Sequence, residues 1–362
     1  MQNTIVAIDL AKNSFYVHIA DKQGRMIKQK KKLSRLGLRK FISSLAPSTI
    51  AIEACGGSNH WARKFAELGH TVKMIAPQFV KPYVKADKTD AKDAAAIAEA
   101  SSRHHMNFVA VKTLSQQDIK ALHSIRNRLV GNKVQLTNEM RGILNEYGII
   151  AAKGDSALKK KVIEIIDRNF ESKDWEEVTD FLRTKAQELY DELCELEKRI
   201  AQKDTEISHH CKNDDAIKRL MKIPGIGPIT ASTLVAHVGN AKTFKSARQF
   251  ASYFGLVPRE HSTGGKTRLL GISKRGDKHI RTLFIHGARA LVAGVRYVKK
   301  ERFADWMQTR SRQLRWAHKL LETKGMNKTV VALANKHARI AWAILAKDMD
   351  FDPEHKSVKK SA

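Results

Sequence analysis

Over the first hundred residues the apolar positions switch between a period of two and a period near 3.6, which is typical of alternating strands and helices. The stretches 4–10 and 14–20 carry the β-branched and aromatic residues of neighbouring strands, and 24–33 repeats the pattern with one charged face. We therefore predict an α/β domain, a mixed sheet with helices packed on it. In chain order the predicted strands are 4–10, 14–20, 24–33, 49–55 and 71–77, and the predicted helices are 33–45, 58–68 with Ser58 as N-cap, and 88–100.

The middle of the chain changes to a period of seven. From about 115 to 147 the apolar positions are seven apart with weaker intermediate positions, and from about 180 to 208 two such series interleave. That pattern predicts a coiled-coil hairpin or a dimerising arm; an internal helix pair that contacts nothing else is the alternative. The first series is Leu122, Leu129, Leu136 and Ile143, and the second pair is Ala186, Leu193, Ile200 and Ile207 with Leu182, Leu189 and Leu196.

After residue 213 the pattern is helical and punctuated by glycine, and 329–346 reads as one long amphipathic helix. The last residues are predicted to be a frayed basic tail. The resulting division is 1–110 for the α/β domain, 111–212 for the helical hairpin, 213–350 for a mainly α-helical C-terminal domain, and 351–362 for the tail.

The charge of the chain points to a polyanionic partner. Its 362 residues include 66 Lys and Arg against 37 Asp and Glu, a formal net charge of +29. Such a surplus repels itself unless a polyanion neutralises it, and nucleic acid is favoured over an anionic membrane surface. No stretch approaches the roughly 18 uninterrupted apolar residues of a membrane span. The three cysteines, without a CxxC pair, fit a reducing cytoplasm rather than a disulfide framework.

Acidic residues interrupt the apolar pattern of the N-terminal domain at two strand ends. Asp9 ends the run IVAI and Glu53 ends the run TIAI, although a carboxylate at the end of a buried strand is costly without compensation. Asp90 and Asp93 are three residues apart, on one face of a helical turn. Together these four carboxylates would form a site suited to Mg²⁺ or Mn²⁺. Two such ions can bind both the attacking and the leaving oxygen when a phosphodiester bond is cut. Individually, each has an ordinary interpretation as a turn residue or a helix cap.

The segment PGIGP resembles the turn of a helix-hairpin-helix. Gly225 and Gly227 lack side chains, so their backbone N–H groups can approach a phosphate, and the helix that follows adds partial positive charge. Such a contact would position nucleic acid without reading its sequence. A bare helix–helix turn is the alternative.

The segment 259–281 places a small hydroxyl among many cations. Ser262 and Thr263 precede Gly264 and Gly265 in what we expect to be a flexible turn. A hydroxyl there is a candidate nucleophile for a phosphodiester, although it needs activation and nearby cations. A solvated basic loop is the plain alternative. The candidate cations, also predicted nucleic-acid contacts, are Lys266, Arg268, Lys274, Arg275 and Arg281.

The order of these motifs along the whole chain supplies the context. AIDLAKNS, IEACGG, KTDAKDA, IPGIGPITA and GLVPREHSTGGKTRLLGISKRGDKHIRTLFIHGA follow one another, and the chain ends in NKTVVALANKHARIAWAIL. This arrangement resembles the DEDD-type, Piv-like transposases of insertion-sequence family 110, and within it subgroup 1111. The resemblance implies an RNase H-like (RuvC-like) domain, a coiled-coil dimerisation region, and a C-terminal transposase domain with a catalytic serine.

Carried over position by position, the resemblance assigns the metal tetrad to Asp9, Glu53, Asp90 and Asp93. The family serine falls in HSTGG, where this chain has serine then threonine, which favours Ser262 over Thr263 as nucleophile. The resemblance also implies a structured non-coding guide (bridge) RNA, DNA element ends and target as partners, and a homo-oligomer (dimer or tetramer). The function so predicted is an RNA-guided DNA recombinase. Its alternatives are a metal-dependent junction nuclease without a covalent intermediate, and a non-enzymatic protein that binds nucleic acid.

Overall fold

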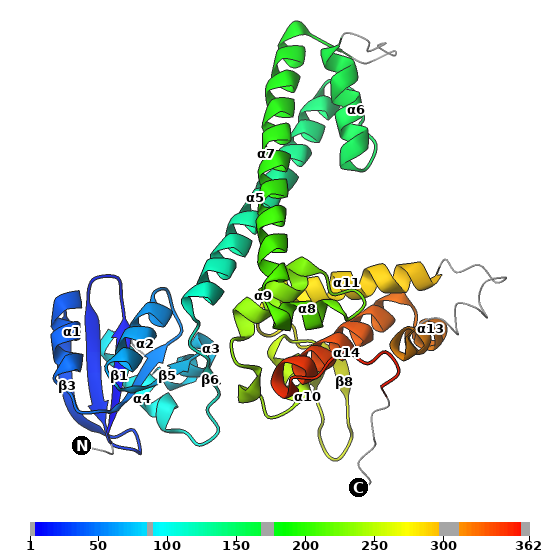
Figure 1. Ribbon diagram of the computed structural model, residues 1–362. Helices are drawn as coiled ribbons and strands as arrows, with labels where there is room; N and C mark the ends of the chain where they lie inside the picture. Colours follow the sequence, from blue (N-terminus) through cyan, green and yellow to red (C-terminus); the bar gives the residue numbers. More distant parts are fainter. Residues whose placement is uncertain (1–3, 85–89, 168–176, 297–310, 356–362) are drawn as a thin grey trace. The chain divides into compact units, whose positions relative to one another are not determined.

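The computed structural model describes residues 4–84, 90–167, 177–296 and 311–355 (Figure 1). The chain divides into two compact units, residues 1–113 and 114–362, and each is treated by itself. The predicted hairpin and the predicted C-terminal domain thus fall into one unit. No helix among the described residues is long and apolar enough to cross a membrane.

A six-stranded mixed sheet forms the centre of the first unit. β1 pairs antiparallel with β2 and parallel with β4, so the sheet changes strand direction beside β1. β6 was not predicted from the sequence, because two residues are too few to show a period. The strands are β1 (Ile5–Leu10), β2 (Phe15–Ala20), β3 (Met26–Leu33), β4 (Thr49–Glu53), β5 (Thr71–Ile75) and β6 (Phe108–Val109), in the order β3-β2-β1-β4-β5-β6.

Helices cover both faces of this sheet, because alternate strand residues point to opposite sides. Ile8 and Ile52 belong to one apolar core with α1 (Arg35–Ser43) and α2 (Ser58–Glu67). On the other face, Ala7 and Ala51 belong to a second core with α4 (Asp90–Ser102). The short α3 (Pro77–Val80) and a 3₁₀ turn, η1 (Lys81–Tyr83), follow β5.

The predicted capping role of Ser58 is wrong. Gly57 is the N-cap of α2, and Ser58 is the first helical residue. Its hydroxyl donates a hydrogen bond to the carbonyl oxygen of Cys55 at 2.9 Å instead of accepting one from the helix. Ser58 thereby joins the start of α2 to the residues that follow β4.

Two long helices and a shorter one build a hairpin in the second unit. α5 (Leu114–Glu146) and α7 (Asp180–Lys212) pack along each other, and α6 (Asp155–Ile166) packs against α7. Of the heptad residues of α7, Leu193 is fully buried and Leu196 is 6% exposed, in a core shared with α5 and α6. The heptad pattern is therefore buried within one chain. Dimerisation through this region stays a prediction.

The remaining helices of the second unit surround a larger apolar core that also receives the C-terminal end of α7. The predicted helix 329–346 lies within α14, and an antiparallel pair of short strands, β7 and β8, appears where a flexible loop was expected. These elements are α8 (Asp215–Met221), α9 (Pro228–Val238), η2 (Ala241–Thr243), α10 (Ala247–Tyr253), β7 (Pro258–Glu260), β8 (Leu269–Ile272), α11 (Lys278–Arg296), α13 (Arg312–Lys324) and α14 (Met326–Lys347).

The predicted tail begins too early. Phe351 packs against the C-terminal core, and the backbone N–H of Arg312 donates to the carbonyl oxygen of Pro353 at 3.0 Å. These contacts hold the first residues of the predicted tail in place, because Phe351 has an apolar surface to bury. Residues 356–362 lie outside the described part of the chain.

Candidate active site

Two carboxylates end adjacent parallel strands of the sheet. Ile8 of β1 pairs with Ile52 of β4, and Asp9 and Glu53 are the next residue on each strand. Neighbouring strands lie about 4.8 Å apart, and strand alternation puts both residues on the face of Ala7 and Ala51, the face that α4 covers. Both are half-buried. The predicted pairing of these two acids at one sheet edge is therefore present in the backbone geometry.

The thiol of Cys55 lies in the electrostatic field of both carboxylates. Its Sγ donates to the carbonyl oxygen of Leu10 at 3.7 Å, which ties the residues after β4 to the end of β1. Burial raises the pKa of the Cys55 thiol, and the negative charges of Glu53 and then Asp9 raise it further. Both carboxylates therefore act on the thiol of Cys55. Nothing in the sequence pattern indicated Cys55 as a neighbour of this site.

α4, which covers this face of the sheet, carries two further acidic residues. It packs against β1 and β2, and Asp93 is half-buried in its first turn. Asp90 begins the helix, and its side chain lies outside the described residues. Within the described residues no three acidic, histidine or cysteine side chains form a group that could hold a metal ion. The metal tetrad thus stays a prediction, for which Asp9, Glu53 and Asp93 supply carboxylate oxygens of the hard type that Mg²⁺ prefers.

The candidate serine lies in a tight hairpin rather than a flexible turn. Thr263 and Lys266 exchange backbone hydrogen bonds, at 3.4 Å and 3.0 Å, across a two-residue turn. The turn residues Gly264 and Gly265 have φ values of 54° and 75°, a region that other residues rarely adopt. A hairpin turn with two positive φ angles matches the natural twist of paired strands. Thr-Gly-Gly-Lys therefore defines the end of the β7–β8 hairpin.

Ser262 makes two hydrogen bonds in this hairpin, although its side chain is exposed. Its hydroxyl donates to Glu260 Oε1 at 2.6 Å, and its Oγ accepts the backbone N–H of Arg268 at 3.3 Å. Glu260 was not predicted as a partner of Ser262, because a loop was expected there. In an extended strand, residues two apart share a face, and that spacing was the available signal.

The cations predicted around the serine divide into two groups. Lys266, Arg268, Lys274 and Arg275 are exposed, so their charges are available to a ligand. Arg281 is only 9% exposed, and its guanidinium donates to the carbonyl oxygens of Phe254 at 3.1 Å and Arg275 at 2.9 Å. The prediction that Arg281 contacts nucleic acid is not supported by this geometry. It holds the segment after β8 in place, because a buried guanidinium needs acceptors.

The PGIGP turn uses its glycines for different purposes. A Cβ on Gly225, whose φ is 82°, would lie 2.9 Å from the carbonyl oxygen of Gly287 in α11. Glycine is thus required there by helix packing, rather than by the approach of a phosphate. Gly227 is exposed, has open space where a Cβ would be, and is the N-cap of α9 without a side-chain cap. A backbone contact of Gly227 with phosphate stays a prediction.

Comparison with protein-family models finds two matches. Residues 217–304 match the model described as the transposase IS116/IS110/IS902 family, and this range includes PGIGP and the serine hairpin. Residues 6–149 match a second transposase model, that of the DEDD transposases of the IS110 type. This range includes the sheet edge that bears Asp9 and Glu53, called the acidic edge from here on. Each candidate region therefore lies inside a separate transposase match.

Comparison with individual proteins extends the similarity over nearly the whole chain. A probable family 20 transposase of Pseudomonas aeruginosa is 45% identical over 348 residues, covering 96% of this chain and 98% of that protein. The transposase for insertion sequence element IS1111A of Coxiella burnetii is 40% identical, covering 95% and 90%. A pilin gene-inverting protein of Moraxella bovis is 25% identical, covering 97% and 98%.

Proposed function

The chain belongs to the IS116/IS110/IS902 family of transposases, enzymes that cut and rejoin DNA. From this premise we propose that it is an RNA-guided recombinase with a serine nucleophile. The observation that carries the serine mechanism is the 2.6 Å hydrogen bond from the Ser262 hydroxyl to the Glu260 carboxylate. A weak nucleophile next to a proton acceptor is the arrangement that covalent catalysis needs.

The proposed step begins with attack of Ser262 Oγ on a phosphorus atom of DNA. Glu260 accepts the hydroxyl proton as the Oγ–P bond forms, and the P–O bond to one side of the DNA backbone breaks. The departing oxygen takes up a proton, and the other DNA end stays joined to the serine as a phosphodiester. Attack by a different DNA end on this linkage rejoins the strands and frees Ser262. No external energy source is required, since one phosphodiester replaces another.

The exposed cations of the hairpin support this step. Lys266, Arg268, Lys274 and Arg275 are available to balance the charge on the phosphate oxygens during attack. Phosphoryl transfer depends chiefly on such positioning and charge stabilisation. The net charge of +29 supports binding to the rest of the nucleic acid.

The acidic edge is proposed as the divalent metal site of the enzyme. Asp9, Glu53 and Asp93, together with Asp90, would hold Mg²⁺ or Mn²⁺, which when bound stabilises negative charge at the scissile phosphate. Without an ion, the two strand-end carboxylates repel one another and any approaching phosphate. The acids therefore suit a cation better than they suit DNA alone.

The guide and the assembly complete the proposal. The family resemblance supports a structured non-coding RNA, encoded beside the gene, that selects element ends and target. It also supports a homo-oligomer, dimer or tetramer, in which the acidic edge of one protomer acts with Ser262 of another. Co-purification of one discrete RNA and light scattering of the complex test these two parts separately.

The decisive experiment is a denaturing gel of protein incubated with guide RNA, Mg²⁺ and labelled DNA. Wild type should show a slow-migrating covalent protein–DNA band, and Ser262→Ala should lose it while still binding RNA and DNA. Thr263→Ala is the matched control, because adjacent strand residues point to opposite faces. The reverse pattern moves the nucleophile to Thr263. A band that survives both substitutions refutes a serine mechanism in this hairpin, and cleavage without a band favours the junction-nuclease alternative.

A further inference from the structure

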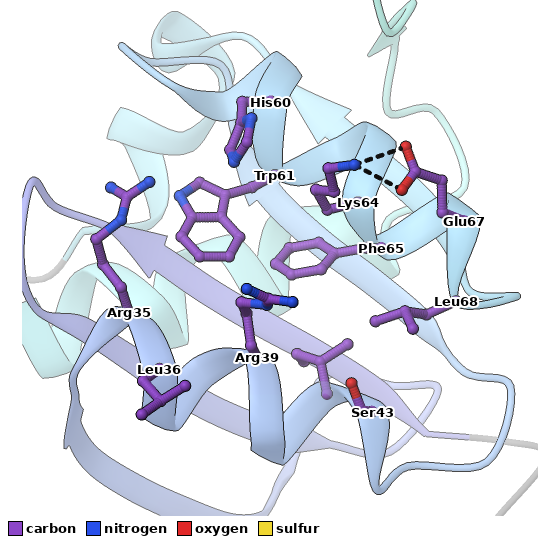
Figure 2. A pocket seen from close by; sticks show the side chains of 11 residues that line it. Arg35, Leu36, Arg39, Ser43, His60, Trp61, Lys64, Phe65, Glu67 and Leu68 are labelled. Atoms are coloured by element: carbon purple, nitrogen blue, oxygen red, sulfur yellow. Dashed lines mark hydrogen bonds and ion pairs between the residues drawn. The ribbon is translucent and has the colours of Figure 1, made fainter.

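A basic groove lies between α1 and α2 on the first unit, on the layer opposite α4 (Figure 2). Its volume is about 660 Å³, and its lining comes from these two helices and from Leu68, the residue that follows α2. The floor is apolar and closed, since Trp61 is 5% exposed and Phe65 is 1% exposed. An apolar floor strengthens electrostatic attraction at the rim, because it lowers the local dielectric constant.

The charges at the rim are predominantly positive. Arg35, Arg39 and Lys64 line the groove, and the single carboxylate among the lining residues, Glu67, is paired with Lys64 at 2.8 Å. Within the described part of the chain Arg39 has no ion-pair partner. Burial lowers the pKa of His60, and the charges of Arg35, Arg63 and Lys64 lower it further, as expected in a positive field.

The groove begins at the edge of the sheet that bears the carboxylates. The Arg35 guanidinium stacks over Trp61 at 5.1 Å and donates to the carbonyl oxygen of Lys12, three residues after Asp9. α2 begins five residues after Glu53, and Ser58 in its first turn bonds back to Cys55. From there α1 leads away with Arg39 one turn beyond Arg35, about 6 Å along the helix axis. The cations thus form a row that starts where β1 and β4 end.

We propose that this groove holds the DNA strand that flanks the phosphodiester cut at the acidic edge. The inference rests on the proposed function, because it takes that edge as the cleavage site. DNA is the favoured occupant because the groove starts at the acidic edge. The DNA strand that is cut there must continue away from the carboxylates, and the groove provides a path for it. The groove offers that strand cations for its phosphates and an apolar floor beneath its sugars. No sequence reading is expected, because contacts of this type go to the backbone.

The test is a DNA-binding measurement with full-length protein and its guide RNA, in EDTA so that no cleavage occurs. The probe is a labelled DNA duplex that carries the end of the element and its flank. Arg39→Glu should weaken binding about tenfold. The slope of log affinity against log salt concentration should also become less steep by about one, as expected for the loss of one phosphate contact. Lys40→Glu is the matched control, because Lys40 is the next residue of α1, is exposed, and does not line the groove. It changes the net charge equally and should weaken binding less than twofold.

Three outcomes overturn the inference. Equal losses for Arg39→Glu and Lys40→Glu would mean that only the net charge matters. Normal DNA binding by both Arg39→Glu and the double variant Arg35→Glu with Arg39→Glu would leave the groove without this role. Weaker binding of the guide RNA with unchanged DNA binding would assign the groove to RNA. Because binding in EDTA needs neither Ser262 nor a metal ion, these results are independent of the covalent-adduct experiment.

Discussion

The two candidate catalytic regions are built in different ways. Asp9 and Glu53 follow fully buried strand residues, and their positions depend on a six-stranded sheet covered by helices. Ser262 stands on a hairpin of two short strands, and residues 259–271 are all exposed. The acids are positioned by a core whose parts come from distant segments, whereas the serine is positioned by a turn of two glycines.

Because of this difference, substitutions at the acidic edge and in the hairpin should have different consequences. A change at the acidic edge removes charge without disturbing the packing beneath it, because both side chains are only half-buried. A change in the hairpin has little core to disturb, so it should alter the geometry of Ser262 and leave unfolding unaffected. Activity and stability measurements on matched variants therefore test the acidic edge and the hairpin separately.

The largest expected effect is at the acidic edge. Asp9→Asn or Glu53→Gln should lower covalent-adduct formation at least about a thousandfold, because each removes a charged metal ligand. The midpoint of thermal unfolding should stay close to that of wild type, because each substitution keeps the size and shape of the side chain and both side chains are only half-buried. Excess EDTA should reproduce the loss in wild type. Glu99→Gln is the control, an acid on α4 paired with Arg103. Full activity of Asp9→Asn in EDTA would remove the metal hypothesis.

At the hairpin, Glu260→Gln should slow adduct formation about a hundredfold, within the usual range for general-base catalysis. The amide oxygen of glutamine can still accept the Ser262 hydrogen bond, so the geometry is retained while the base is lost. DNA binding should be unchanged. The rate of Glu260→Gln should also rise more steeply with pH than that of wild type, as hydroxide replaces the base. An unaltered rate would show that Glu260 only positions the serine.

A smaller effect is expected at the turn itself. Gly264→Val or Gly265→Val should reduce adduct formation about tenfold, because a branched side chain at positive φ costs roughly 1–2 kcal/mol. Gly271→Val is the control, a glycine of the same hairpin without positive φ and with open space where a Cβ would be. Thermal unfolding should be nearly the same for all three, because the exposed hairpin can relieve the strain by changing its local conformation without disturbing the core. Loss of stability instead of activity would show that the hairpin belongs to the core.

The smallest expected effect uses Cys55 as a probe of the acidic edge. Burial and the charges of Glu53 and Asp9 raise the pKa of its thiol, so little thiolate is present near neutral pH. Adding Mg²⁺ neutralises these carboxylates and should lower that pKa, which speeds alkylation of Cys55 severalfold at pH 7.5. Cys194 in α7 is the internal control. An equal rate with and without Mg²⁺ in wild type, beside a faster rate in Glu53→Gln, would place the ion elsewhere.

Much of the site was predictable because its determinants are local in sequence. Apolar runs that end in Asp9 and Glu53 predict strand-end carboxylates, and the order of motifs indicates the family. Glu260 was not predicted, because its role depends on whether 258–272 is a hairpin or a loop. Arg281 was assigned to nucleic acid because composition does not show burial. Its guanidinium bonds inward only in the packed chain.

By itself the sequence determined the alternation of strands and helices, the heptad positions of α7, the excess of positive charge and the family. Each of these depends on spacing or composition along the chain. Only the tertiary structure decided that α5 and α6 bury most of those heptad positions within one chain. It also decided that Gly225 must lack a side chain, because a Cβ there would collide with α11. It also decided that Arg35 and Arg39 form a row beginning at the acidic edge. The physical reason is that burial and proximity arise from contacts between distant segments, which periodicity does not specify.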